Sequence, residues 1–263
     1  MIKFDAMHFL KQLFYIIFVV IILSACRASR PDINDTRIVQ IPEESHDSIL
    51  SKLPDYSESL YSVSGKGRAI VSEPGNSDRV TIEFETDTLI SLLTIKNRIG
   101  IVGAVMLVDQ DSIFIYNKVD KVAQKVSIID SRLTSLNELA SINLIDLLNY
   151  KVKPGQIASI ERHYQGTDFT TFIIFKTGGY ARVSEKNKEI EYVEQPRFTG
   201  LPYSAIRYEN YGTINGYILP RKITILSADE ASKVIFQVRS LDTNPGSLNL
   251  EIDLPNDIPI ERI

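Results

Sequence analysis

The sequence has no tryptophan, only one cysteine and no excess of positive charge over its 263 residues. A single cysteine cannot form a disulfide within the chain or assemble a cysteine metal site. Lysine and arginine total 29 against 33 aspartate and glutamate residues, so the chain lacks the basic excess that binds a nucleic-acid backbone. The hydrophobic fraction of 44% and the charged fraction of 24% are typical of a globular protein. We therefore expect no nucleic-acid partner.

Residues that carry catalysis are scarce as well. The sequence has three histidines and no G-x-S-x-G elbow that would mark an activated serine. His163 lies near Glu161 and Asp168, which is typical of a solvated residue in a charged turn, and a hydrolase that uses His163 stays as an alternative. Asp109 and Asp111 do not continue into an EF-hand loop, which predicts hairpin-turn carboxylates. The sequence predicts no enzyme, no catalytic residue, no metal site and no cofactor.

An apolar segment near the N-terminus is typical of an export signal. Lys3 and Lys11 accompany an uninterrupted apolar run at 13–23, whereas a membrane-spanning helix needs about 20 such residues. The run ends in Leu-Ser-Ala-Cys, which resembles the lipobox of bacterial lipoproteins and ends at Cys26. We predict that residues 1–25 are a lipoprotein signal peptide and that Cys26 is the lipidation site.

The residues after Cys26 predict how the protein is held. A diacyl or triacyl cysteine, with palmitate-type chains, anchors a protein stably to a membrane, whereas one acyl chain binds only marginally. Arg27 replaces the aspartate that commonly retains lipoproteins in the inner membrane of enteric bacteria, so we expect the outer membrane and the periplasmic side. Charges, prolines and a lack of periodicity predict a lipid-anchored flexible tether at 26–44, followed by one β domain at 45–263.

Most of that domain has the pattern of β-strands. Val80, Ile82 and Phe84 alternate with polar residues, which places one side of a strand on a core and the other in water. Several other segments are apolar at consecutive positions, as in strands covered on both faces. The predicted strands lie at 66–72, 79–86, 89–97, 99–108, 111–118, 121–129, 168–176, 179–185, 188–194, 203–210, 216–226, 232–240 and 247–254. The last of these has the clearest alternation.

Two segments have helical spacing instead. An amphipathic helix is predicted over 135–150, with a capping box at its start and Pro154 and Gly155 after its end. A shorter helix is predicted over 47–53. The fold class is therefore mainly β with a few helices. The apolar side chains fit either an ordinary packed core or a cavity under a helical lid, because both use the same residue types.

The order of these elements resembles the LolA/LolB group, and in particular a branch of outer-membrane lipoproteins whose domain has no assigned function. The segments that carry the resemblance lie at 60–71, 89–118 and 215–238. The resemblance implies a curved antiparallel incomplete barrel closed by a helical lid. It also implies a hydrophobic cavity that takes the acyl chains of lipoproteins or other lipids during transfer.

Candidate residues follow from this resemblance. Leu144, Leu147 and Leu148 are the lid candidates. Ile99 falls at the loop that meets the membrane in LolB-type proteins, although its alternation with Ile101 also fits a plain strand. Candidates for the cavity wall are Val80, Ile82, Phe84, Leu92, Ile113, Ile115, Phe172 and Phe236.

The predicted partners are the membrane, through acylated Cys26, and acyl chains or lipoproteins as cargo, with no protein partner specified. The alternative function is a structural or interaction lipoprotein. It would use the same fold as a platform in an envelope assembly, without lipid cargo.

Overall fold

The computed structural model describes residues 36–128 and 140–262. The predicted signal peptide, Cys26 and Arg27 lie outside the described residues. The proposed capping box at 135–138 lies outside them as well. Within the described part of the chain, no helix combines the length and apolar character needed to cross a membrane.

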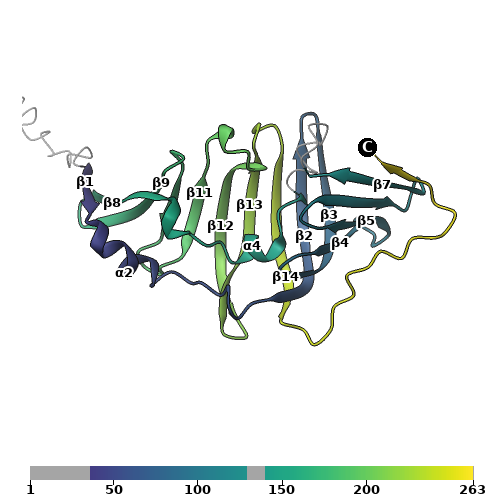
Figure 1. Ribbon diagram of the computed structural model, residues 1–263, viewed down its shortest axis with the longest axis horizontal. Coiled ribbons are helices and arrows are strands. Elements are labelled where there is room, and N and C mark those ends of the chain that lie inside the picture. The colour runs from purple at the N-terminus through teal and green to yellow at the C-terminus, as the bar shows by residue number, and fades with distance from the viewer. Residues whose placement is uncertain (1–35, 129–139, 263) are drawn as a thin grey trace, which may run out of the picture.

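One open sheet of fifteen strands forms the body of the molecule (Figure 1). Its centre is the pairing of β14 with β2, which joins two antiparallel meanders. The first meander comprises β2 (Ser62–Glu73), β3 (Asn76–Asp87), β4 (Ser91–Lys96), β5 (Val102–Val108), β6 (Ser112–Asn117) and β7 (Val122–Ser127). The second comprises β8 (Ile157–Gln165), β9 (Asp168–Phe175), β10 (Tyr180–Val183), β11 (Ile190–Glu194), β12 (Tyr203–Ile214), β13 (Tyr217–Ser227) and β14 (Lys233–Thr243).

Short strands complete the two ends of the sheet. At one end β1 (Thr36–Ile41) pairs antiparallel with β8, and at the other β15 (Ile260–Arg262) pairs parallel with β7. The two end strands do not pair with each other, so the sheet stays open. This architecture confirms the predicted fold class, mainly β with few helices, and agrees with an incomplete barrel.

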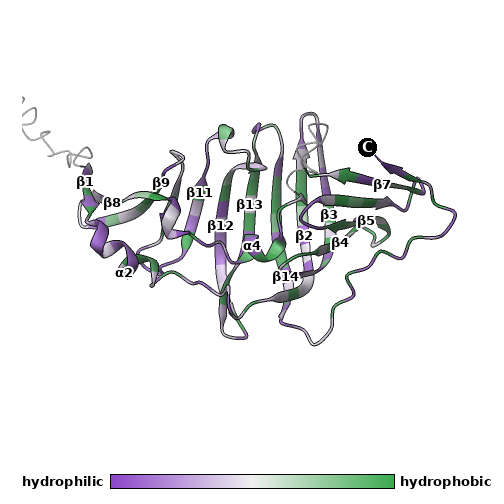
Figure 2. Ribbon diagram, in the orientation of Figure 1, coloured by the Kyte–Doolittle hydropathy of each residue, from purple (hydrophilic) through white to green (hydrophobic). Residues whose placement is uncertain are grey.

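The main core lies on one face of the sheet, under a few short helices. These are α2 (His46–Leu50), α4 (Leu144–Leu148) and the 3-10 turns η1 (Glu43–Ser45), η2 (Pro154–Gln156) and η3 (Arg197–Thr199). Helix α4 crosses in front of β13 and β14, and Figure 2 shows hydrophobic residues on α4 and on the strands behind it. Four of its five residues are buried in the core, each of which stabilises the fold by roughly 1.5–3 kcal/mol.

Small residues in β2 make room for two aromatic rings on this face. A Cβ at Gly67 would lie 2.3 Å from the Phe236 ring, and a Cβ at Gly65 would lie 2.8 Å from the Phe84 ring. The two rings meet edge to face, with centroids 5.9 Å apart. Glycine in these strand positions therefore serves close packing between strands.

The described part of the helix predicted over 135–150 is interrupted, because Ala140 is helical and residues 141–143 are not. Of the described residues in 135–150, only Leu144–Leu148 form an α-helical run of more than one residue, and Asn143 caps it by accepting a hydrogen bond from the Ile145 N–H. The same side chain donates to the Asp87 carbonyl, so a tertiary contact fixes where the helix starts. The helix ends at Leu148, and Pro154 opens η2 instead of marking the stop. The helix predicted over 47–53 is present as α2, which begins at His46 and ends at Leu50.

Three strands were not predicted, namely β1, β8 and the short β15. Residues 36–41, placed in the tether by the sequence, form β1 and pair with 160–165 of β8. Strand β8 was not predicted because charged residues such as Glu161 and Arg162 interrupt its apolar alternation. Backbone hydrogen bonds to β1 and β9 hold β8 in the sheet in spite of that composition.

The predicted strand at 247–254 was wrong, although its alternation has a structural meaning. The segment is extended and pairs with no strand, yet Leu248, Leu250, Ile252 and Leu254 are half-buried while the residues between them are exposed. Its anchors are the Asn249 N–H, which donates to the Glu85 carboxylate, and the pairing near β7. An alternating pattern reports one covered side, and it does not require a hydrogen-bonded neighbour.

Candidate functional site

An apolar cavity of about 360 Å³ lies between the sheet and the segment that leads into α4. Its floor consists of two cross-strand rows over β13, β14, β2 and β3, one from Ile223 to Val80 and one from Ile225 to Asp78. Apart from Asp78 and Ser91, all its lining side chains are apolar. They are Val71, Val80, Ile82, Leu93, Ile95, Met106, Ala140, Ile142, Leu144, Leu147, Ile223, Ile225, Val234 and Phe236.

Two of the lid candidates cover this cavity. Leu144 and Leu147 project from α4 and are each 7% exposed. Leu148, the third candidate, is buried in the main core and does not line the cavity. A helix places residues three apart on one face, so Leu144 and Leu147 point the same way.

The wall candidates fall into four groups, of which three lie at or near the cavity. Val80, Ile82 and Phe236 line the cavity. Phe84 lies beneath the wall, 2% exposed and packed on the Phe236 ring. Ile113 belongs to a neighbouring core cluster around Met106 and Val108, with Ile115 packed against it, and Met106 connects that cluster to the cavity.

Leu92 and Phe172 lie elsewhere. Leu92 is paired with Glu85 and so faces the opposite side of the sheet from Leu93, which lines the cavity. Phe172 lies in β9, where its ring stacks on His163 with centroids 4.3 Å apart. A run of consecutive apolar residues does not reveal which alternate side chains face inward. The sequence therefore predicted Leu92 for the cavity wall, where Leu93 lies instead.

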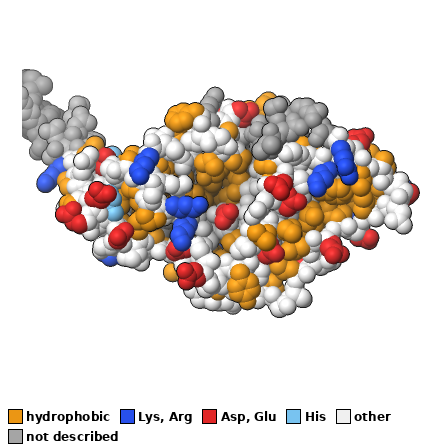
Figure 3. All heavy atoms as spheres, in the orientation of Figure 1, with side chains coloured by type: hydrophobic (Ala, Val, Ile, Leu, Met, Phe, Trp, Pro, Cys, Tyr) orange, Lys and Arg blue, Asp and Glu red, His pale blue; other side chains and the backbone are white. Residues whose placement is uncertain are grey.

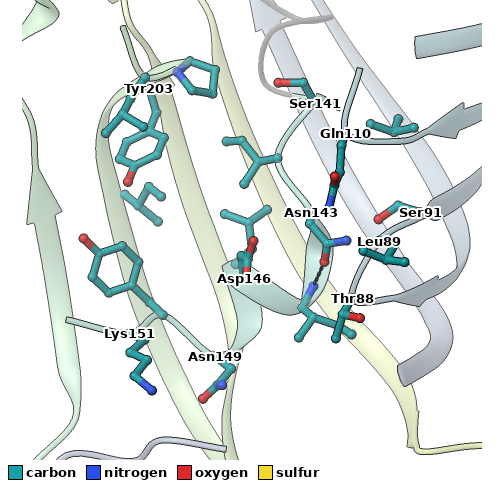
Figure 4. Close-up of a pocket in the computed structure, with 18 of the residues that line it drawn as sticks. Thr88, Leu89, Ser91, Gln110, Ser141, Asn143, Asp146, Asn149, Lys151 and Tyr203 are labelled. Carbon is teal, nitrogen blue, oxygen red and sulfur yellow. Dashed lines mark hydrogen bonds between the residues drawn. The ribbon is translucent and has the colours of Figure 1, made fainter. Parts of the chain in front are cut away.

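A larger, polar cavity of about 690 Å³ lies on the other side of Leu147 (Figure 4). It shares Ser91, Ile142 and Leu147 with the apolar cavity. Its other lining residues are mostly amides, hydroxyls and charged groups. They include Thr88, Asp109, Gln110, Asn143, Asp146, Asn149, Tyr150, Lys151, Lys153, Gln156, Gln195 and Tyr203.

Asp146 is the carboxylate of this cavity that has no close partner. Asp146 lines the cavity as an exposed residue, and no described residue donates a hydrogen bond to it. Burial by the surrounding protein raises the pKa of the Asp146 carboxyl, and the charge of Lys153 acts in the opposite direction. Lys151, by contrast, pairs with Asp55 at 2.7 Å. Asp109 accepts hydrogen bonds from the backbone of its own turn.

Tyrosines form the wall opposite α4. Tyr150 and Tyr203 line the polar cavity and share a hydrogen bond, and Tyr208 lies behind Tyr150 with ring centroids 6.1 Å apart. The Tyr208 hydroxyl is buried and has no hydrogen-bond partner among the described residues. Burial raises the pKa of all three phenols, so they remain protonated donors at neutral pH.

The turn between β4 and β5 carries Ile99, which is 80% exposed. The Asn97 side chain accepts hydrogen bonds from the Ile99 and Ile101 N–H groups and so fixes the turn. Ile99 is thus a turn residue and not the strand residue that its alternation also allowed. Arg98 beside it joins Arg79 in lining a groove of about 520 Å³.

His163 is not in a turn. It lies in β8, where its Nε2 is 3.0 Å from the Glu161 carboxylate and its ring packs on Phe172. The turn prediction failed because β8 was not recognised. Asp109 and Asp111 do lie in the hairpin turn between β5 and β6. Across the described ranges, no group of histidine, cysteine, aspartate or glutamate side chains is placed to hold a metal ion.

Hydrophobic side chains are also visible on the molecular surface. Figure 3 shows them gathered over the middle of the face that carries α4 and over the end formed by β3 to β7. Larger exposed apolar patches commonly mark binding sites for lipid or protein.

Comparison with known proteins identifies the fold. A DUF1329 family protein from Desulfovibrio piger is similar over 78% of this chain and 93% of its own, with 10% identity and a TM-score of 0.50. A putative outer membrane lipoprotein-sorting protein domain from Vibrio parahaemolyticus matches over the same shares, with 12% identity and a TM-score of 0.52. These two likenesses show that the chain has a LolA-like fold, as the resemblance predicted. No family model matches the chain, and no curated protein matches it.

Proposed function

We propose that the protein is an outer-membrane lipoprotein, anchored through Cys26, that binds acyl chains in the apolar cavity and passes them on without covalent chemistry. The observation that carries the proposal is the cavity itself. Its wall is formed by strands β2 to β5 from the first meander and by β13 and β14 from the second. Its cover is the short helix α4. Its volume of about 360 Å³ lies in the range of roughly 300–1,000 Å³ typical of ligand sites.

Lipid content tests this proposal directly. Residues 26–263 carrying Cys26→Ser retain every described residue and can be exported to a bacterial periplasm and purified without detergent. Mass spectrometry of an organic extract should find phospholipid or acyl species in stoichiometric amount. A folded protein without lipid would contradict the proposal.

The lid assignment has its own variant. Leu147→Glu places a carboxylate between the two cavities, where apolar chains would have to pass it. The variant should lose most of the bound lipid while its circular dichroism spectrum stays that of the parent. Lipid content equal to the parent in a folded variant would contradict the assignment of α4 as the lid.

The turn that carries Ile99 supports contact with a membrane. Beside it, Arg68, Arg79 and Arg98 line a cavity of about 700 Å³ whose lining residues include no carboxylate. An exposed isoleucine with neighbouring arginines suits an anionic membrane surface. Ile99→Asp should therefore slow lipid transfer to anionic vesicles several-fold. Val119→Asp is the matched control, since Val119 is 71% exposed in the turn between β6 and β7. Equal rates for both variants would contradict this role.

The platform alternative predicts a different result from the same preparations. An empty, folded protein that co-purifies with another envelope protein would support it. The open sheet favours neither outcome by itself, because one fold serves several functions.

A further inference from the structure

The apolar and polar cavities are neighbours on either side of α4. Leu147, Ile142 and Ser91 line both, so the partition between the cavities is one side chain thick at these residues. One side of this boundary is almost entirely apolar and the other is rich in amides, hydroxyls and charges. A ligand that occupies both must be amphiphilic, with its chain on the sheet side and its polar end beyond Leu147.

Charges in the polar cavity indicate which polar end fits. Lys151 forms an ion pair with Asp55, and Asp109 accepts hydrogen bonds from the backbone of its own turn. Asp146 and Lys153 remain, one negative and one positive, with no ion pair closer than 4 Å between them in the described structure. Their charges complement a head group that carries a cation and an anion together.

The hydrogen bonding of Asp146 indicates which kind of cation the head group carries. Asp146 lacks a donor among the described residues, so a ligand with N–H groups would satisfy it and a quaternary ammonium would not. Hydrogen bonds to a charged acceptor contribute more than neutral ones. Because Tyr150 and Tyr203 share one hydrogen bond, one phenol O–H of the pair is left to donate to a phosphate or ester oxygen from the opposite wall.

We propose that the polar cavity binds the head group of a zwitterionic phospholipid with a primary ammonium, which Asp146 accepts, while Lys153 faces the phosphate. This inference rests on the proposed function, because the acyl chains of the same lipid would occupy the apolar cavity. It narrows the cargo from any acylated molecule to the phosphoethanolamine class.

A lipid competition experiment tests the inference. Residues 26–263 with Cys26→Ser would be incubated with vesicles of equal parts phosphatidylethanolamine and phosphatidylcholine with identical acyl chains. Bound lipids would then be counted by mass spectrometry. We expect the ethanolamine lipid to be bound about tenfold more than the choline lipid, which corresponds to about 1.4 kcal/mol. Equal binding of both would overturn the inference and leave the proposed function intact, whereas binding of neither would overturn the proposed function.

Three variants separate the head-group contacts. Asp146→Asn should abolish the preference for ethanolamine while total lipid stays near the parent level. Lys153→Gln should lower the binding of both lipids, since both carry the phosphate. Lys186→Gln, in the turn between β10 and β11, is the control and should change neither. A preference that survives Asp146→Asn would overturn the assignment of the ammonium to that carboxylate.

Discussion

Glycine at residue 67 determines where the Phe236 ring lies in the cavity wall. A methyl group at this position would lie 2.3 Å from the ring and 2.9 Å from the Gln237 carbonyl oxygen. Either the ring or the strand must therefore move. We therefore expect Gly67→Ala to lower the free energy of unfolding by about 1–3 kcal/mol, as overpacking does. Urea denaturation would measure the loss.

A second glycine provides the control for this prediction. A Cβ at Gly103 in β5 would meet only the Ile95 carbonyl oxygen, at 3.9 Å. Gly103→Ala should therefore cost little or even stabilise the strand. Comparable losses in both variants would show that glycine as such, and not the contact with Phe236, sets the stability.

Asp146 gives the protein a pH dependence of predictable sign. Its pKa is raised in the folded protein, so folding favours the protonated carboxyl, and this group costs stability above that pKa. The cost disappears as the pH falls below the ordinary value of 3.8. Asp146→Asn should accordingly raise the urea midpoint at pH 7 and have no effect near pH 3. A variant less stable than the parent at pH 7 would contradict this sign. A gain in stability together with a loss of ethanolamine preference would mark Asp146 as a binding residue.

At the scale of the element, Asn143 connects α4 to the sheet. Its side chain caps the helix through the Ile145 N–H at 2.8 Å and donates to the Asp87 carbonyl at 2.9 Å. Asn143→Ala removes both bonds and should cost about 1–2 kcal/mol of unfolding free energy. Lipid retention should fall with it, because the lid loses its fixed start. Asn187→Ala, which removes one exposed bond to Glu189, serves as control in the same denaturation and lipid assays.

The elements differ in how far their sequences predict them. The hairpin of β2 and β3 was predictable, because alternation on both sides of Pro74 and Gly75 fixes its pairing. The break at 141–143 in the helix predicted over 135–150 was not foreseen, because helical spacing says nothing of a cap such as Asn143, which depends on a contact with Asp87. Strand β8 is stabilised by backbone pairing with β1 and β9, and its own charged composition gives no strand pattern.

The candidate site was predictable only where apolar and polar residues alternate along a strand. Val80 and Ile82 were found because they alternate with polar residues and so reveal their inward parity. Leu93 and Ile95 were missed because apolar residues occur at both odd and even positions around them. Only the pairing with β3 and β5 shows which face of the sheet their side chains occupy. The polar cavity could not be predicted, since its residues come from loops, from α4 and from several strands that meet only in the fold.

At the scale of the whole molecule, β1 shortens the predicted tether. Because Thr36–Ile41 pair with β8, the segment between Cys26 and the sheet comprises at most residues 26–35. A fully extended chain of that length spans roughly 35 Å at most. Figure 1 shows β1 at one end of the sheet, far from β7, so the predicted anchor enters at the end opposite to the β3–β7 meander.

The C-terminal segment runs along that opposite end of the sheet. It leaves β14, runs past β4 and β5 and reaches β7 (Figure 1), with fixed points at Glu85 and at the Ala123 N–H. Between these points, on the side of the sheet away from the cavity, Val105 and Tyr116 are only 8% and 5% exposed. We infer that the half-buried leucines of this segment cover them.

Truncation after residue 246 should therefore loosen one end of the molecule and leave the other unchanged. Amide hydrogen exchange should accelerate at least tenfold in β5, β6 and β7, which lose apolar cover and the pairing of β7 with β15. Strands β9 to β12 should exchange at the parental rate, because their core lies at the other end of the sheet. Uniform acceleration would instead mean that the fourteen remaining strands unfold as one cooperative unit. Unchanged rates in β5 to β7 would mean that the segment covers nothing.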